Sequence, residues 1–268
     1  KRKDVFTDRS GKSLNYSWQE TNIGTAVRFP LYFTRSKYYK GLQPFASYSL
    51  KFRDMDNDSP LRFRKSNISS LGFGLYLYHN LKRSQRQLMP RWGQTLNVRY
   101  YYTPFDDKIS SVLGITGTLY FPGLLRNHGI SVSGSYQEMK SGYYAYSDII
   151  LFPRGYSNLS FDEVFSARTG YAFPLFYPDF SLGPVIYLQR VKMKLFYDWA
   201  QGSNNNKTST ISSLGAELTG DMHLLRFLAP IELGVRGIYI PEKEDYQFEL
   251  MFAVNFDTFY LNGRDLER

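Results

Sequence analysis

Residues 91–103 read RWGQTLNVRYYYT, and apolar and polar side chains alternate along most of this stretch. A period of two residues is typical of a β-strand with one apolar and one polar face. The pattern returns near the C-terminus, where alternate positions hold Tyr246, Phe248, Leu250, Phe252, Val254 and Phe256. We therefore expect strands to be the main element of this fold.

Stretches of this kind recur along the whole chain, and most are longer than the ~5–6 residues of a typical soluble strand. They reach the ~9–11 residues that a tilted strand needs to cross a bilayer. No linker or shift in composition divides the 268 residues, so we predict a single domain, 1–268, with about twelve antiparallel strands. The expected strands are 12–20, 21–34, 40–53, 67–82, 91–103, 109–121, 129–140, 163–176, 189–200, 210–222, 229–240 and 246–259. The segment 178–187 is expected to hold one helical turn.

Composition favours a membrane barrel over a soluble β-sandwich. A sandwich turns the apolar faces of its strands inward, whereas a transmembrane barrel turns them outward to lipid. Mean hydropathy is −0.39 and no long apolar run occurs, so the sequence predicts no transmembrane helix. Aromatic residues make up 18% of the chain, and Tyr and Phe form the interfacial girdles of outer-membrane barrels. We predict an all-β antiparallel transmembrane β-barrel of the bacterial outer membrane, with the soluble sandwich as an alternative.

The chain is basic, with a net charge of +9, but its charges do not form the stripe that nucleic-acid binding would need. Lys192 and Lys194 alternate with apolar residues, so we interpret such charges as lining a lumen or loops and expect no nucleic-acid partner. Late strands carry Glu217, Glu232, Arg236 and Glu249, and of these Glu217 and Arg236 are expected to face the lumen and to form a cross-strand polar network. The absence of Cys argues against disulfides and thiolate metal sites.

Three motifs follow one another between residues 153 and 198. PRGY at 153–156 lies in the longest expected connection between strands, FPL at 173–175 ends the next strand, and FYD at 196–198 lies on the strand after it. This ordered series resembles the C-terminal half of the Omp85 superfamily, the outer-membrane barrels that include BamA and TamA. In that family a (V/I)RG(F/Y) tetrad lies at the tip of the sixth extracellular loop. The family has sixteen strands, so the resemblance implies either a smaller barrel or one whose N-terminal strands and periplasmic domains are missing here.

The resemblance also implies roles for individual residues. The motif that locks the loop inside the barrel would comprise Arg154, Gly155, Tyr156 and Asp198. The strand motif would comprise Phe173, Pro174 and Phe196. The last strand would form one lip of a weak seam and carry Phe248, Phe252 and Phe256. The sequence departs from the family pattern at Pro153, Gly170 and Ala200.

Physical reasoning favours the same pairing of Arg154 with Asp198. An arginine on a loop that enters a partly desolvated lumen needs a carboxylate for charge-assisted hydrogen bonds. Asp198 is the candidate because Tyr197 and Trp199 have the opposite parity and would face lipid. Gly155 would let the loop reverse its direction. The alternative is an exposed arginine in an ordinary turn.

The remaining groups of histidine, serine and acidic residues do not match known metal or catalytic sites. His79, His128 and His223 lack metal-ligand spacing, and the pairing of His128 with nearby serines lacks the nucleophile elbow of a hydrolase. The acidic residues of 54–58 lack the glycine and the terminal glutamate of an EF-hand. We therefore expect no metal, no cofactor and no enzymatic activity.

The resemblance implies that this barrel inserts outer-membrane proteins or translocates polypeptide without cofactor or nucleotide. The expected partners are outer-membrane lipids and lipopolysaccharide, client outer-membrane polypeptides, and accessory lipoproteins or periplasmic domains. An incoming strand would pair with the edge of the seam. The alternative is a non-enzymatic pore or transport barrel, which would share the wall but have an open lumen.

Overall fold

The computed structural model describes residues 2–7, 13–34, 36–55, 66–84, 86–156, 159, 161–183, 185–204, 207–224 and 231–254; for residues 2–7, 13–16 and 55 it describes the backbone alone. Almost all of the regular structure in these ranges is strand. The elements are β1 (Arg2–Thr7), β2 (Ser13–Arg28), β3 (Leu31–Tyr32), β4 (Tyr38–Met55), β5 (Asn67–Leu81), β6 (Gly93–Tyr102), β7 (Ser111–Pro122), β8 (Gly129–Lys140), β9 (Glu163–Phe176), β10 (Phe180–Leu182), β11 (Ile186–Asn204), β12 (Lys207–Leu224), β13 (Ile231–Ile240), the 3₁₀ helix η1 (Pro241–Lys243) and β14 (Asp245–Val254).

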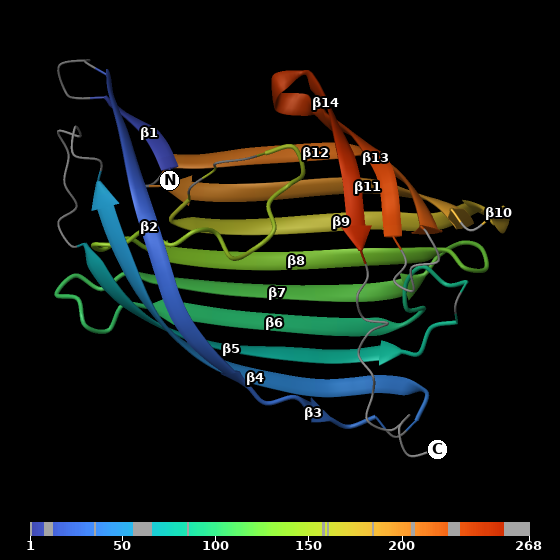
Figure 1. The fold of residues 1–268 in the computed structure, drawn as a ribbon, viewed down its shortest axis with the longest axis horizontal. Coiled ribbons are helices and arrows are strands. Elements are labelled where there is room, and N and C mark those ends of the chain that lie inside the picture. Colours follow the sequence, from blue (N-terminus) through green and yellow to red (C-terminus); the bar gives the residue numbers. More distant parts are fainter. Residues whose placement is uncertain are drawn as a thin grey trace.

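The strands form one antiparallel sheet that curls into the shape of an open barrel (Figure 1). Its strand order follows the sequence, β1-β2-β4-β5-β6-β7-β8-β9-β11-β12-β13-β14, while β3 and β10 pair only with β4 and β11. Within the described residues the sheet does not close, because β1 and β14 are its two edges. β1 pairs only with Ser13–Trp18, so the second half of β2 also borders this opening.

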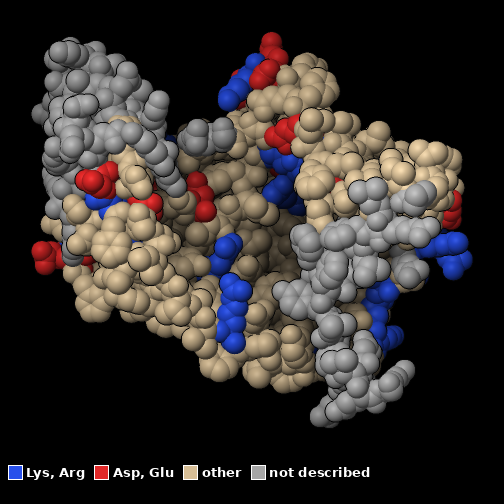
Figure 2. All heavy atoms as spheres, viewed as in Figure 1, with Lys and Arg blue, Asp and Glu red and all other residues tan. Residues whose placement is uncertain are grey.

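Side chains alternate between the concave inner face and the convex outer face. On β5 the inward Ile68 and Ser70 are buried, whereas the outward Phe73 is 46% exposed. On β11 Asp198 is fully buried, whereas its neighbour Tyr197 is 49% exposed. Figure 2 looks into the opening and shows charged side chains inside the hollow. The apolar faces of the strands therefore point outward.

The structure confirms the predicted all-β antiparallel class and most strand positions. Residues 12–20 and 21–34, expected as two strands, belong largely to the single strand β2, and β1 was not expected. The helical turn expected in 178–187 is wrong: Phe180–Leu182 is the strand β10, and a short helix lies instead at Pro241–Lys243. Asp56, Asn57, Asp58 and Phe256 lie outside the described residues.

No helix in the described part of the chain is long and apolar enough to cross a membrane.

Candidate functional site

The connection between β8 and β9, residues 141–162, crosses the concave side of the sheet (Figure 1). Its Ile150 and Phe161 are buried against Val164 of β9, Ala200 of β11 and Ile211 of β12. These apolar contacts remove the loop side chains from water, which favours the inward position of the loop. We call residues 141–162 the inner loop.

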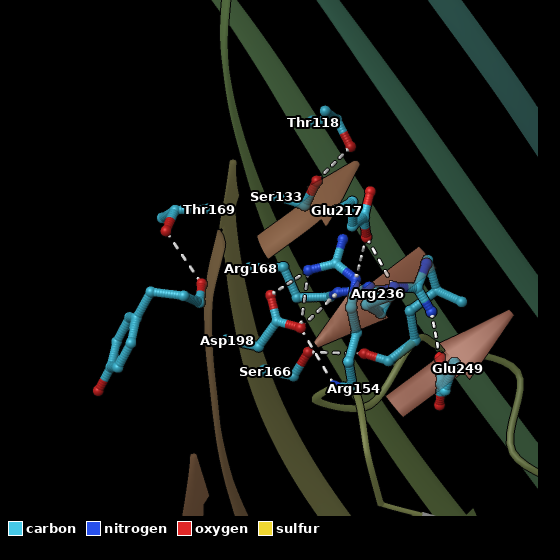
Figure 3. Close-up of polar contacts among 12 residues, drawn as sticks. Thr118, Ser133, Arg154, Ser166, Arg168, Thr169, Asp198, Glu217, Arg236 and Glu249 are labelled. Carbon is cyan, nitrogen blue, oxygen red and sulfur yellow. Dashed lines mark hydrogen bonds and ion pairs between the residues drawn. The ribbon is translucent and has the colours of Figure 1, made fainter. Parts of the chain in front are cut away.

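Arg154, in the turn at the tip of the inner loop, binds Asp198 on the inner face of β11 (Figure 3). Its Nη1 donates to both Oδ1 and Oδ2 of Asp198 at 3.0 Å, and its backbone N–H donates to Oδ2 at 3.1 Å. The Asp198 side chain is fully buried and that of Arg154 is 11% exposed. Three charge-assisted hydrogen bonds therefore hold the tip of the loop on the barrel wall.

The ion pair continues into a network of charges on the neighbouring strands (Figure 3). Arg154 Nε lies 3.2 Å from Glu217 Oε1 on β12, and Arg168 Nε on β9 lies 3.4 Å from Asp198 Oδ2. Arg236 on β13 binds Glu217 at 2.9 Å and Glu249 on β14 at 2.7 Å. The network thus pairs three arginines with three carboxylates and crosses β9, β11, β12, β13 and β14. Balanced pairing of this kind offsets the cost of taking the charges out of water.

The surroundings of Arg154 have opposing effects on the pKa of its guanidinium group. Burial and the nearby Arg168 lower the pKa of Arg154, whereas Asp198 and Glu217 raise it. The guanidinium stays charged because arginine does not lose its proton in proteins. The guanidinium carbon Cζ of Arg154 also lies 4.2 Å from the centre of the Phe196 ring, which adds a cation–π contact.

Gly155 and Tyr156 shape the tip and attach it to the β14 side of the opening. Gly155 has a φ of +82°, and the Tyr156 N–H closes the turn onto the Pro153 carbonyl at 3.4 Å. The Tyr156 hydroxyl lies 2.6 Å from Glu242 Oε2 in η1 and 3.2 Å from the Ser212 carbonyl, and burial together with Glu242 raises the pKa of Tyr156. The tip is therefore tied to the turn that precedes the edge strand β14.

The first part of the inner loop is attached to the opposite side of the opening. Lys51 of β4 lies over the rings of Tyr144 and Tyr146, with Nζ 4.0 and 4.8 Å from their centres. Tyr144 donates to Glu20 of β2 at 3.4 Å, and the Tyr146 hydroxyl lies 2.6 Å from Ser70 Oγ of β5. Burial raises the pKa of Tyr146 to about 12, so this phenol stays neutral over the ordinary pH range.

Polar contacts also hold the middle of the inner loop. Gln137 of β8 donates to Asp148 at 2.6 Å and accepts from the Ile149 N–H at 2.8 Å, while Arg99 of β6 donates to the Ile149 carbonyl. The inner loop thus runs across the lumen from β2 and β4 to β12 and η1. It connects both sides of the opening through side chains rather than through strand pairing.

The structure brings some of the predicted site residues together and leaves others apart. Arg154, Gly155, Tyr156, Asp198 and Phe196 meet at the loop tip. Phe173 lies elsewhere, stacked on His128 at a distance of 5.4 Å between ring centres. Pro174 pairs with Lys192 next to an irregularity in the register of β9 and β11. Phe248 and Phe252 are 85% and 68% exposed on the outer face of β14.

Sequence reasoning missed several partners of the loop. It placed Glu217 and Arg236 together, and the structure confirms that contact, but it did not connect Glu217 to Arg154. Arg168 shares the inward parity of β9 and could have been found from the strand pattern. Ser212 and Glu242 contact Tyr156 across long sequence separations, for which the alternation gives no signal.

No protein-family model matches this chain, and no curated protein matches it. Among the described residues, no group of His, Cys, Asp and Glu side chains could hold a metal ion.

Proposed function

We propose that this chain is an outer-membrane barrel of the Omp85 type that inserts or translocates polypeptides, with the inner loop locked in its lumen. The observation that carries the proposal is the bonding of Arg154, at the tip of the inner loop, to the buried Asp198. The arginine of an ordinary exposed turn would be solvated by water and would not bind a fully buried carboxylate. The PRGY, FPL and FYD motifs point to the same family.

The outer surface supports a position in the membrane. Large apolar side chains on several strands, such as Leu119 of β7, Leu195 of β11 and Val235 of β13, are 44–48% exposed on the outer face. Monomeric soluble proteins rarely expose apolar patches of this extent. Lipid would cover these side chains, as it covers the outer band of known barrels.

The open seam supplies the element that would act on clients. Tyr246, Phe248, Leu250 and Phe252 of β14 are between 68% and 89% exposed, more than the outward residues of the paired strands named above. An unpaired strand edge offers backbone donors and acceptors to a further strand. A client strand would pair there without cofactor or nucleotide, while the inner loop keeps the flanking strands in place.

The test is client insertion by the purified chain in liposomes. A urea-unfolded outer-membrane barrel is added, and its folding is followed by heat-modifiable migration in gels. Leaving a buried charge unpaired costs about 3–5 kcal/mol. We expect Arg154→Gln and Asp198→Asn each to reduce the insertion rate about tenfold or more. The double variant should be no slower than the slower single variant, because the two residues act as one pair.

Arg190→Gln is the matched control, since Arg190 pairs with Asp221 on the same wall. It should insert clients at the wild-type rate. A charge exchange is a weaker test, because Asp198→Arg would place a cation beside Arg168 and Arg154→Asp a carboxylate beside Glu217. Leakage of an entrapped dye without any client insertion would contradict the proposal and favour the alternative, a pore.

A further inference from the structure

The outer face of β5–β8 carries an apolar groove of about 690 Å³. Its outward walls are made by Leu77, Leu96, Leu119 and Val132. Its floor is the pair Gly117 and Gly134, which face each other on β7 and β8. A Cβ on Gly134 would meet no atom within 4 Å, and one on Gly117 would meet only the Thr95 carbonyl at 3.9 Å, so the floor is open space.

The shape of the groove admits a narrow occupant. Ile115 and Leu119 flank Gly117 on the same face of β7, and four residues of strand span about 13 Å. Their side chains fill part of that gap, so a helix of about 10–12 Å diameter does not fit. An extended hydrocarbon chain does fit, and it needs no hydrogen bonds from a wall whose strand backbones are already paired.

One end of the groove is polar and basic. Its lining ends at His79 and Gln94, which lie 3.4 Å apart, and His79 pairs in register with Lys40 of β4. Tyr38 packs on His79 with 4.6 Å between ring centres, and Lys37 and Lys40 both lie close to the Tyr38 ring. Two cations, an imidazole and an amide therefore lie where an apolar groove ends. An apolar groove with a basic end matches an amphiphile that has an apolar chain and an anionic head.

We propose that this groove binds an anionic phospholipid, with one acyl chain over Gly117 and Gly134 and the phosphate beside Lys37, Lys40 and His79. The inference rests on the proposed position of the chain in a membrane. The groove lies on the outer face of β5–β8, whereas Arg154 binds Asp198 on the inner face of β11, and β14 does not reach this wall. It is therefore a site separate from both the loop lock and the seam.

The experiment places the folded chain in nanodiscs with equal amounts of phosphatidylglycerol and phosphatidylethanolamine and counts retained lipids by native mass spectrometry. Wild type should retain phosphatidylglycerol preferentially. The double variant Lys37→Gln/Lys40→Gln should lose the preference by about fivefold per lysine. Gly134→Leu should lose the retained lipid altogether, because its side chain fills the floor of the groove.

Two matched controls isolate the site. Gly237→Leu adds the same side chain on the outer face of β13, far from the groove, where a Cβ would make ordinary contact with Phe248 at 3.5 Å, and Lys207→Gln removes a lysine at the other end of the strands. Both should bind lipid like wild type. Equal retention of the two lipids by wild type, or unchanged retention by Gly134→Leu, would overturn the site while leaving client insertion intact. Failure of the wild-type chain to enter nanodiscs would overturn the membrane proposal itself.

Discussion

At the scale of single residues, Gly155 determines whether the tip can reach Asp198. Its φ of +82° lies in the region that costs other residues about 1–2 kcal/mol. A Cβ there would also lie 3.1 Å from both Ile238 Cγ2 and Ile240 Cδ1. The turn and its close approach to β13 both require glycine at this position.

We expect Gly155→Ala to detach the tip of the inner loop without unfolding the sheet. The measurement is limited proteolysis of the folded chain, in which cleavage within 141–162 should become at least about tenfold faster, because strain and crowding together exceed ~1.4 kcal/mol. Gly117→Ala is the control, since its Cβ would meet only one atom, at 3.9 Å. Equal cleavage of the two variants would show that the left-handed turn does not hold the loop.

At the scale of elements, the inner loop carries a titratable group whose ionisation opposes its attachment. Burial raises the pKa of Asp148 above its usual 3.8, although the hydrogen bond from Gln137 lowers it in part. The attached loop therefore favours the protonated carboxyl. Attachment should be strongest below pH 3.8 and should weaken as the pH rises through the raised pKa of the attached state.

Asp148→Asn should remove this dependence and hold the middle of the loop more firmly at pH 7. Hydrogen exchange of the backbone amides in 141–156, measured at several pH values and corrected for intrinsic rates, tests the expectation. Asp221, buried on β12 and paired with Arg190 and Lys192 of β11, gives the matched variant Asp221→Asn on a different part of the wall. Slower exchange in wild type as the pH rises would contradict the sign of the effect.

The strands of this fold could be predicted because their alternation is local, whereas the contacts of the inner loop could not. The pattern in 91–103 needs no knowledge of any neighbour, and β6 appears there. Parity also placed Asp198 inward and Tyr197 outward. The pairing of Tyr144 with Glu20 and of Tyr156 with Glu242 depends on how a 22-residue connection crosses the lumen, which no periodicity encodes. β1 was missed because its sequence, RKDVFT, is short and half of its residues are charged.

At the scale of the whole molecule, the decisive property is which medium covers the outer face. Leu195 lies near the middle of β11 and is 44% exposed, whereas Leu124 lies in the turn between β7 and β8 and is 89% exposed. In a bilayer the first would face the hydrocarbon and the second would lie at or beyond its edge. In water the two positions would be alike, because both side chains already contact the solvent.

Leu195→Arg should therefore destabilise the chain in liposomes by about 2–4 kcal/mol, and Leu124→Arg by only about 0–1 kcal/mol. Guanidinium unfolding followed by tryptophan fluorescence measures both, since Trp199 lies on the same strand as Leu195. Equal, small effects at the two positions would mean that no lipid covers the middle of the wall, and the sheet would then have to bury its apolar face against another protein. A cost that depends on depth along the strand is the result that only a bilayer explains, because water and a protein partner have no hydrocarbon midplane.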